Sequence, residues 1–161
     1  MTRISTSTQR RLQRLRRRQQ RVIRYGTALR SSLPFRFDAS LSIYGVGAHH
    51  DAITLNTGIS PSSAYLKGEK RFGGKRWKDD LWLLQSPLGE GASLDEHLDW
   101  LWATVGPYKA YFKDLIAVAS SASVTLGCLS ESPYPFFSVG DGSMKIVREL
   151  EVGCSFNFTC V

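Results

Sequence analysis

The most unusual chemistry in this sequence lies in a run of arginines near the N-terminus. Residues 1–36 contain 11 arginines, no lysine and no acidic residue, so the segment carries a charge of +11. Arginine guanidinium groups match phosphate with paired planar donors, and arginine-rich segments commonly fold on RNA. We therefore expect a contact with RNA or DNA phosphates whose affinity falls as salt rises. The candidate contact residues are Arg10, Arg11, Arg14, Arg16, Arg17, Arg18, Arg21 and Arg24.

Other interpretations of this arginine-rich run stay open. Blocks of like charge are often solvated, disordered extensions. Translation can also begin later in the chain. Some bacterial genes start at codons that elsewhere encode leucine or valine, so Leu15 and Val22 are possible start positions. An arginine-rich, serine-containing N-terminus without acidic residues is also typical of organellar transit peptides. An anionic membrane surface is a weaker candidate partner, because the run has no Trp or Phe to insert.

A second basic segment, residues 67–78, interleaves cations with Phe72 and Trp77. Cations beside aromatic rings can bind a single strand by charge and by base stacking. The alternative is an ordinary hairpin loop, in which Gly73 and Gly74 make the turn and Trp77 folds back on the core. The candidate nucleic-acid contacts in this segment are Lys70, Arg71, Lys75 and Arg76.

The sequence contains a compact group of metal-ligand residue types at His49, His50 and Asp51. Adjacent histidines on one element point in different directions, so a site needs His97 or a carboxylate from elsewhere in the fold. Helix capping by Asp51 is the simpler explanation. We therefore predict no metal site.

Patterns for nucleophilic or cofactor chemistry are missing from the sequence. It contains no GxSxG, HExxH or GxxxxGK[ST] pattern. Cys128, Cys154 and Cys160 lie in apolar runs typical of strands, which predicts buried free thiols and a reducing cytoplasm. Glu96 and Asp99 are explained by helix capping and a solvated helix face. We predict no catalytic residue and no cofactor.

One tryptophan is a candidate contact for a protein partner. In the helix predicted from Leu94 to Val105, Trp100 lies off the apolar stripe, and tryptophan dominates many interface hot spots. Packing under the C-terminal segment is the alternative. Trp82 and Trp102, by contrast, occupy positions predicted to face the core.

The elements that must position these residues follow from periodicity. Ser93 and Glu96 form a capping box that starts the main amphipathic helix, and Gly106 and Pro107 end it. Alternation predicts a first strand over 38–45, and the near-continuous apolar run 81–85 predicts a central strand. The other predicted elements are a helix from His50 to Gly58, a strand over 64–67, a helix over 108–119, a strand over 123–129, a helix from Asp141 to Gly153 and a strand over 154–161.

This order predicts the α+β class, with two or three helices packed on one face of a mostly antiparallel, ferredoxin-like sheet. The predicted division is an N-terminal arm and linker over 1–36, helical or disordered, and one domain over 37–161. Residues 37–161 hold 10 basic and 14 acidic residues, so the domain carries −4. No apolar run approaches the roughly 18 residues of a membrane-spanning helix.

The segments LSIYG, DAITLNTGISPSSAYLKGE, LWLL and LDEHLDWLW, with the alternating terminal strand, resemble a bacterial family described as domain of unknown function 4279. The resemblance covers roughly residues 38–161 and excludes the arm. It implies a small bacterial cytoplasmic protein without an assigned reaction, of a kind that is often immunity-like or accessory-like. It supplies no functional residues. We therefore expect a non-catalytic cytoplasmic binding module with a protein partner, or alternatively a nucleic-acid-associated protein that acts through its arm. The sequence does not predict the oligomeric state.

Overall fold

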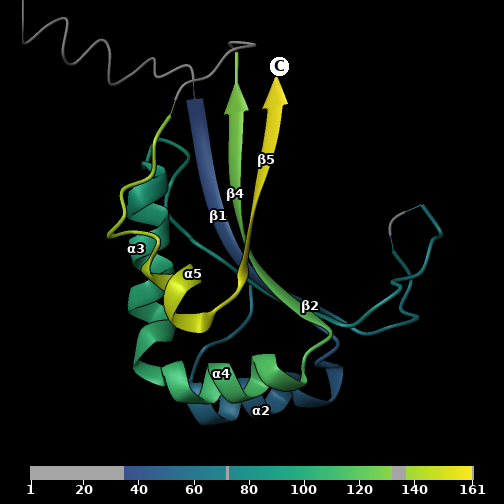
Figure 1. Cartoon of the computed structure of the whole chain (residues 1–161). Coiled ribbons are helices and arrows are strands. Elements are labelled where there is room, and N and C mark those ends of the chain that lie inside the picture. The colour runs from purple at the N-terminus through teal and green to yellow at the C-terminus, as the bar shows by residue number, and fades with distance from the viewer. Residues whose placement is uncertain (1–34, 72, 132–136, 161) are drawn as a thin grey trace, which may run out of the picture. The chain divides into compact units, whose positions relative to one another are not determined.

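A computed structural model describes residues 35–71, 73–131 and 137–160, and shows one sheet with the strand order β2-β3-β1-β4-β5 (Figure 1). The ladders between β2, β3, β1 and β4 are antiparallel, and β5 pairs with β4 in parallel. The unit Phe35–Val161 holds all of the described residues. The strands are β1 (Phe35–Tyr44), β2 (Ser63–Tyr65), β3 (Leu81–Gln85), β4 (Ser121–Ser130) and β5 (Gly153–Cys160).

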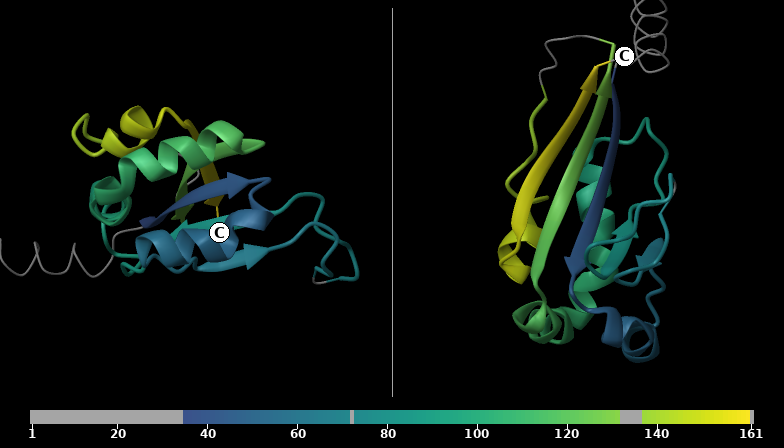
Figure 2. Two further views of the ribbon diagram at one scale, coloured as in Figure 1. Left: turned by 90° about the horizontal axis from the view of Figure 1, so that it is seen from below. Right: turned by 90° about the vertical axis from the view of Figure 1, so that its right-hand side faces the viewer.

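Helices cover one face of this sheet and one of its ends. In two views, α2 and α4 lie at the end of the sheet opposite to the tips of β4 and β5 (Figures 1 and 2). The predicted α+β class with a mostly antiparallel sheet is therefore confirmed. The helices are η1 (Gly47–His49), α2 (His50–Thr57), α3 (Leu94–Val105), η2 (Gly106–Tyr108), α4 (Lys109–Val118) and α5 (Lys145–Leu150).

The centre of the sheet is β1, which corrects the prediction that the 81–85 strand is central. β1 pairs along its whole length with β4 and from Ser40 to Tyr44 with β3. β3 is flanked by β1 and by the three-residue edge strand β2. The apolar run of β3 is explained by burial on both of its faces. Trp82 and Leu84 face the core, whereas Leu81 and Leu83 lie on the other face, where Leu81 is buried and Leu83 is half-buried.

The main helix α3 begins where the capping box predicts. The Glu96 backbone N–H donates to Ser93 Oγ at 3.2 Å, and the Ser93 backbone N–H donates to the Glu96 carboxylate at 2.7 Å. Such a cap stabilises a helix by about 1 kcal/mol. The buried residues of α3 recur at spacings of three and four: Leu94, His97, Leu98, Leu101 and Val105.

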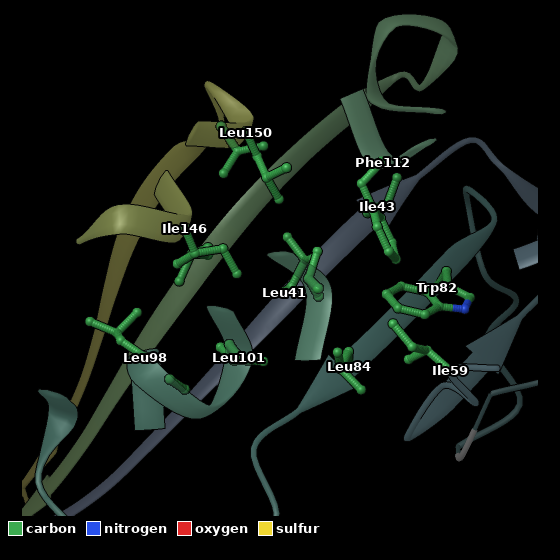
Figure 3. Packing of buried hydrophobic residues seen from close by; sticks show 14 of the residues in the cluster. Leu41, Ile43, Ile59, Trp82, Leu84, Leu98, Leu101, Phe112, Ile146 and Leu150 are labelled. Atoms are coloured by element: carbon green, nitrogen blue, oxygen red, sulfur yellow. The ribbon is translucent and has the colours of Figure 1, made fainter. Parts of the chain in front are cut away.

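The core lies between the inner face of the sheet and the helices (Figure 3). Strand residues Leu41, Ile43 and Trp82 point toward the helices and are fully buried. Because alternate residues of a strand point to opposite faces, the other face of β1 and β4 carries small polar side chains such as Ser40, Ser42 and Thr125. The helix residues that meet the sheet include Leu98, Leu101, Phe112, Ile146 and Leu150.

The last helix is shorter than the sequence predicts, because it runs only from Lys145 to Leu150. Met144 precedes it instead of Asp141, and Glu151 ends it with a left-handed φ of 56° in place of Gly153. The parallel ladder explains the early end. Gly153 already pairs with Ser123 of β4, so the chain must leave the helix before that residue.

Candidate functional site

The basic segment folds as a hairpin that extends away from the sheet between β2 and β3 (Figures 1 and 2). We call Lys67–Lys78 the basic hairpin. Its two arms are joined by backbone hydrogen bonds from the Gly68 N–H to the Trp77 carbonyl at 2.9 Å and from the Trp77 N–H to the Glu69 carbonyl at 3.0 Å. The turn has left-handed backbone at Gly73 (φ 82°) and Gly74 (φ 77°), as predicted. Hydrogen bonding therefore joins the described residues of the two arms.

The structure brings the four predicted contacts of this segment together on the hairpin. Lys70 and Arg76 form an isolated bridge across it, and Arg71 and Lys75 lie next to its turn. Among the described residues, no hairpin cation forms an ion pair. Glu69, the single acid of the hairpin, accepts instead from the Leu66 backbone N–H at 3.0 Å. The six cations and Glu69 give the hairpin a net charge of +5, and the Asp80 carboxylate lies at its base, 2.7 Å from the Lys67 backbone nitrogen.

Trp77 packs on an edge strand and not on the core. Its ring stacks on Tyr65 of β2, with a centroid separation of 4.3 Å and an interplanar angle of 21°. The Arg71 guanidinium lies over the Trp77 ring at 4.7 Å from the centroid, which is a cation–π arrangement. The result is an aromatic platform with a cation stacked on it, within a hairpin that carries further cations.

A second candidate surface is the outer edge of β5. In the described part of the chain, β5 pairs with β4 and has no strand on its other side. Its eight residues, GCSFNFTC, include no charge and no proline. Phe156 is 61% exposed and Phe158 is 43% exposed. The sequence predicts the alternation of β5, but only the structure shows that the helical layer leaves these two rings uncovered.

The exposed rings continue a small aromatic group at this end of the sheet. Phe137 lies 6.3 Å from Phe156 and 5.8 Å from Phe37, centroid to centroid. Phe158 is opposite Cys128 in the β4–β5 ladder, and Cys128 is opposite Phe37 in the β1–β4 ladder, so these residues share one face. An apolar surface therefore reaches from the core to the open edge.

A cavity of about 230 Å³ lies at the same end of the sheet. Arg36 lines it and forms an ion pair with Glu90 at 3.5 Å, while Asp38 lies directly beside Gly127. Cys128 also lines it, and burial raises the pKa of that thiol, which favours the protonated and weakly nucleophilic form. The cavity combines a paired cation with a poorly reactive thiol, which is a poor arrangement for nucleophilic chemistry.

The cysteines are less uniformly buried than the sequence predicts. Cys128 is buried, Cys154 is partly buried and Cys160 is exposed; all three are free thiols. The prediction is wrong for Cys160, because β5 is an edge strand whose last residues extend past the helices.

His97 is fully buried, which periodicity alone can indicate because it lies three residues after Leu94 and four before Leu101. Its Nδ1 lies 3.0 Å from Ser86 Oγ, and its Nε2 is buried without a hydrogen-bond partner among the described residues. Burial lowers the pKa of His97, against the opposing effects of Asp38, the Phe37 backbone and Glu96. The ring is therefore held neutral in the core.

This burial predicts a stability that depends on pH. Because the folded-state pKa of His97 lies below the unfolded value near 6.5, only the unfolded chain takes up a proton as the pH falls through about 6.5. The free energy of unfolding should then fall by up to about 1.4 kcal/mol per pH unit below that point, and should be unaffected by this group above it. Urea unfolding between pH 7.5 and pH 5 measures the slope.

His97→Gln should flatten this slope, whereas the matched variant His49→Gln, at an exposed position, should keep it. Equal slopes in the two variants would contradict the assignment to His97.

The other predicted residues do not gather around His97. His49 is exposed, and His50 is partly buried with its Nε2 unpartnered among the described residues. Nowhere in ranges 35–71, 73–131 and 137–160 do three His, Cys, Asp or Glu side chains form a group that could hold a metal ion.

Trp100 is partly buried and packs against the core, so its role as a protein contact stays a prediction. The eight arginines of the arm lie outside the described residues, and their role also stays a prediction.

Every helix in the described part of the chain is too short or too polar to span a bilayer.

Comparison with known proteins gives one family match. The model of a family described as a domain of unknown function, DUF4279, matches residues 35–160. This range covers the sheet from the first residue of β1 to the last residue of β5. No curated protein and no solved structure matches the chain.

Proposed function

We propose that this chain, which belongs to the DUF4279 family, is a non-catalytic protein-binding module that pairs an extended segment of a partner protein with the outer edge of β5. The observation that carries the proposal is an uncharged, eight-residue strand that has no strand on its outer side in the described part of the chain and carries two exposed phenylalanines. Backbone hydrogen bonds to such an edge supply affinity, and alternate side chains supply specificity.

The absence of protective features on β5 supports this choice of surface. Natural edge strands are usually short, charged, interrupted by proline or covered, because an open edge pairs readily with other chains. At the opposite edge, β2 has only three residues and leads into the basic hairpin. The β5 edge has the length and the neutral character that strand addition requires.

The side chains of β5 indicate the chemistry of the partner segment. A strand added beside β5 places alternate residues next to Phe156 and Phe158 on one face and next to Ser155 and Asn157 on the other. Apolar or aromatic residues suit the first face, and uncharged polar residues suit the second. We therefore expect a partner segment that alternates apolar and polar residues and carries little charge.

The proposal is tested by selecting binders from a displayed library of random peptides. The peptides have about 12 residues, which is roughly the length of β5 plus its ends. Enriched peptides should show the expected alternation. Their affinity, measured by fluorescence anisotropy, should fall at least about tenfold, or about 1.4 kcal/mol, in the variant Phe156→Lys/Phe158→Lys, because the variant removes the apolar contacts on that face and because lysines on an edge strand oppose pairing with another chain. Hydrogen exchange should show new protection in Gly153–Cys160.

Leu55→Lys/Val118→Lys is the matched control, because these two apolar residues are 86% and 66% exposed on α2 and α4 and the variant also adds two lysines. Circular dichroism checks that all variants are folded. Peptides that bind the Phe156→Lys/Phe158→Lys variant as well as the original chain, or that leave exchange in β5 unchanged, would refute the proposal. A dimer in mass photometry that is lost in the same variant would identify a second copy as the occupant instead.

We place this module in the bacterial cytoplasm as part of the proposal. The three free cysteines support a reducing compartment, since Cys160 is exposed and would be open to oxidation elsewhere.

Nucleic-acid association through the arm is the second candidate function, supported by the +11 charge of residues 1–36 against the −4 of the rest. Replacing its eight candidate arginines by glutamine in the full chain should reduce RNA affinity and salt dependence; unchanged values would exclude this candidate.

A further inference from the structure

We propose that the basic hairpin is a separate binding surface for single-stranded nucleic acid. In this proposal the phosphates contact the hairpin cations, and a base stacks at Trp77 where Arg71 now lies. The hairpin joins β2 and β3, so it sits at the edge of the sheet opposite to β5. Occupancy of the two surfaces is thus sterically independent, and this inference does not depend on the proposed protein-binding function.

The first argument is the distribution of charge within the domain. The hairpin contains six of the ten basic residues of the segment 37–161 and only one of its 14 acidic residues. None of these six cations is ion-paired among the described residues, whereas Lys109 and Lys113 on α4 are paired with Glu149 and Glu151. A polyanion is therefore attracted to the hairpin and repelled by the rest of the domain.

The second argument is that the hairpin is ordered before it binds. Arg71 and Lys75 are joined by a backbone hydrogen bond of 2.6 Å, and the Arg76 guanidinium donates to the Gly68 carbonyl at 2.5 Å. At the base, the Lys67 N–H donates to the Asp80 carboxylate at 2.7 Å. Binding then loses less conformational entropy than binding by an unstructured basic loop does.

The third argument selects nucleic acid among polyanions. Trp77 is stacked on Tyr65 at 4.3 Å, so its plane is held in place, and Arg71 lies over it at 4.7 Å. Displacement of Arg71 would uncover ring surface for a base and would free the guanidinium for the neighbouring phosphate. An acidic peptide or an anionic membrane would use the cations but has no base to stack.

The test measures binding of a thymidine oligonucleotide of about 12 nucleotides, a usual site size for single strands, by fluorescence anisotropy at several salt concentrations. The full chain is used with the eight candidate arm arginines replaced by glutamine, so that the arm does not mask the hairpin. In this background, Lys70→Gln/Lys75→Gln should weaken binding about tenfold. The slope of log affinity against log salt should shrink by about 1.4, since each phosphate contact with a single strand contributes about 0.7.

Lys109→Gln/Lys113→Gln is the control, because it removes the same number of lysines and the same net charge from α4. It should change affinity by less than about twofold if the hairpin is the contact surface. An equal loss in the two double variants would show that only net charge matters and would refute the proposal.

A second measurement tests the stacking step by comparing two oligonucleotides. An abasic oligonucleotide of the same length carries the same phosphates, and it should bind about tenfold more weakly than the thymidine strand. In the Trp77→Leu variant, the ratio of the two affinities should fall to near one. Equal affinity for the two strands, or tighter binding to phosphatidylglycerol vesicles or polyglutamate than to the thymidine strand, would overturn the assignment to nucleic acid.

Discussion

Replacement of Trp82 by alanine should lower the free energy of unfolding by about 3–5 kcal/mol. Trp82 is fully buried on β3 and packs against Phe112 of α4, with a centroid separation of 5.8 Å (Figure 3). It also lies next to Ile43 across the β1–β3 ladder. Removing the indole leaves a cavity between the sheet and the helices, because the strand backbone is held by two neighbours and cannot collapse into the space.

Trp82→Phe should cost less, about 1–2 kcal/mol. The indole Nε1 is buried without a hydrogen-bond partner among the described residues, so phenylalanine removes a polar group that the fold does not satisfy. Trp100→Ala is the second control, since that tryptophan is only partly buried. Urea unfolding followed by circular dichroism gives the three values. A loss for Trp82→Ala no larger than the loss for Trp100→Ala would contradict the central position of Trp82 in the core.

The second large effect is expected at Gly45, where β1 ends. Gly45→Ala should lower the free energy of unfolding by about 3 kcal/mol, of which about 1–2 kcal/mol comes from the left-handed backbone at φ 77°. A Cβ at this position would lie 2.1 Å from Ser120 Oγ and 2.9 Å from Ser120 Cβ. Ser120 cannot simply retreat, because its N–H donates to the Tyr44 carbonyl at 2.9 Å.

Gly58→Ala separates the two contributions. Gly58 ends α2 with a similar φ of 71°, but no atom lies within 4 Å of a Cβ built there. This variant should therefore cost only the conformational penalty of about 1–2 kcal/mol. Adding Ser120→Gly to Gly45→Ala removes the clashing side chain and should restore most of the difference. Equal losses for Gly45→Ala and Gly58→Ala in urea unfolding would show that the close approach to Ser120 has no energetic weight.

The two proposed surfaces have different origins in the sequence. The cations and aromatic residues of the basic hairpin are adjacent in the chain, so composition alone indicates a candidate contact with nucleic acid. The stacking of Trp77 on Tyr65 required the pairing of β2 with β3, which sequence reasoning could not place. The β5 surface gave no such compositional signal, because the sequence of an alternating strand does not show whether its outer edge is paired with another strand.

Local patterns determined much of the fold. The capping box at Ser93, the helical spacing from Leu94 to Val105 and the left-handed stop at Gly58 involve residues a few positions apart, so they form as predicted wherever the elements pack. The same is true of the strand boundaries at Leu81 and Gln85. The order of these elements was sufficient for the α+β class, because two-layer packing leaves few alternatives.

Tertiary structure decided the properties that depend on distant neighbours. β1 is central, and β3 is not, because two long strands, β4 and β5, lie beyond β1, whereas only the three-residue β2 lies beyond β3. The parallel pairing of Gly153 with Ser123 ended α5 early, and the lack of any described strand beyond β5 left Phe156 and Phe158 exposed. The surroundings of His97 were likewise decided by packing, which places Ser86 Oγ 3.0 Å from its Nδ1 and leaves its Nε2 without a hydrogen-bond partner among the described residues. Local sequence sets which element forms, whereas the face it buries and the edge it leaves open depend on contacts made across the whole sheet.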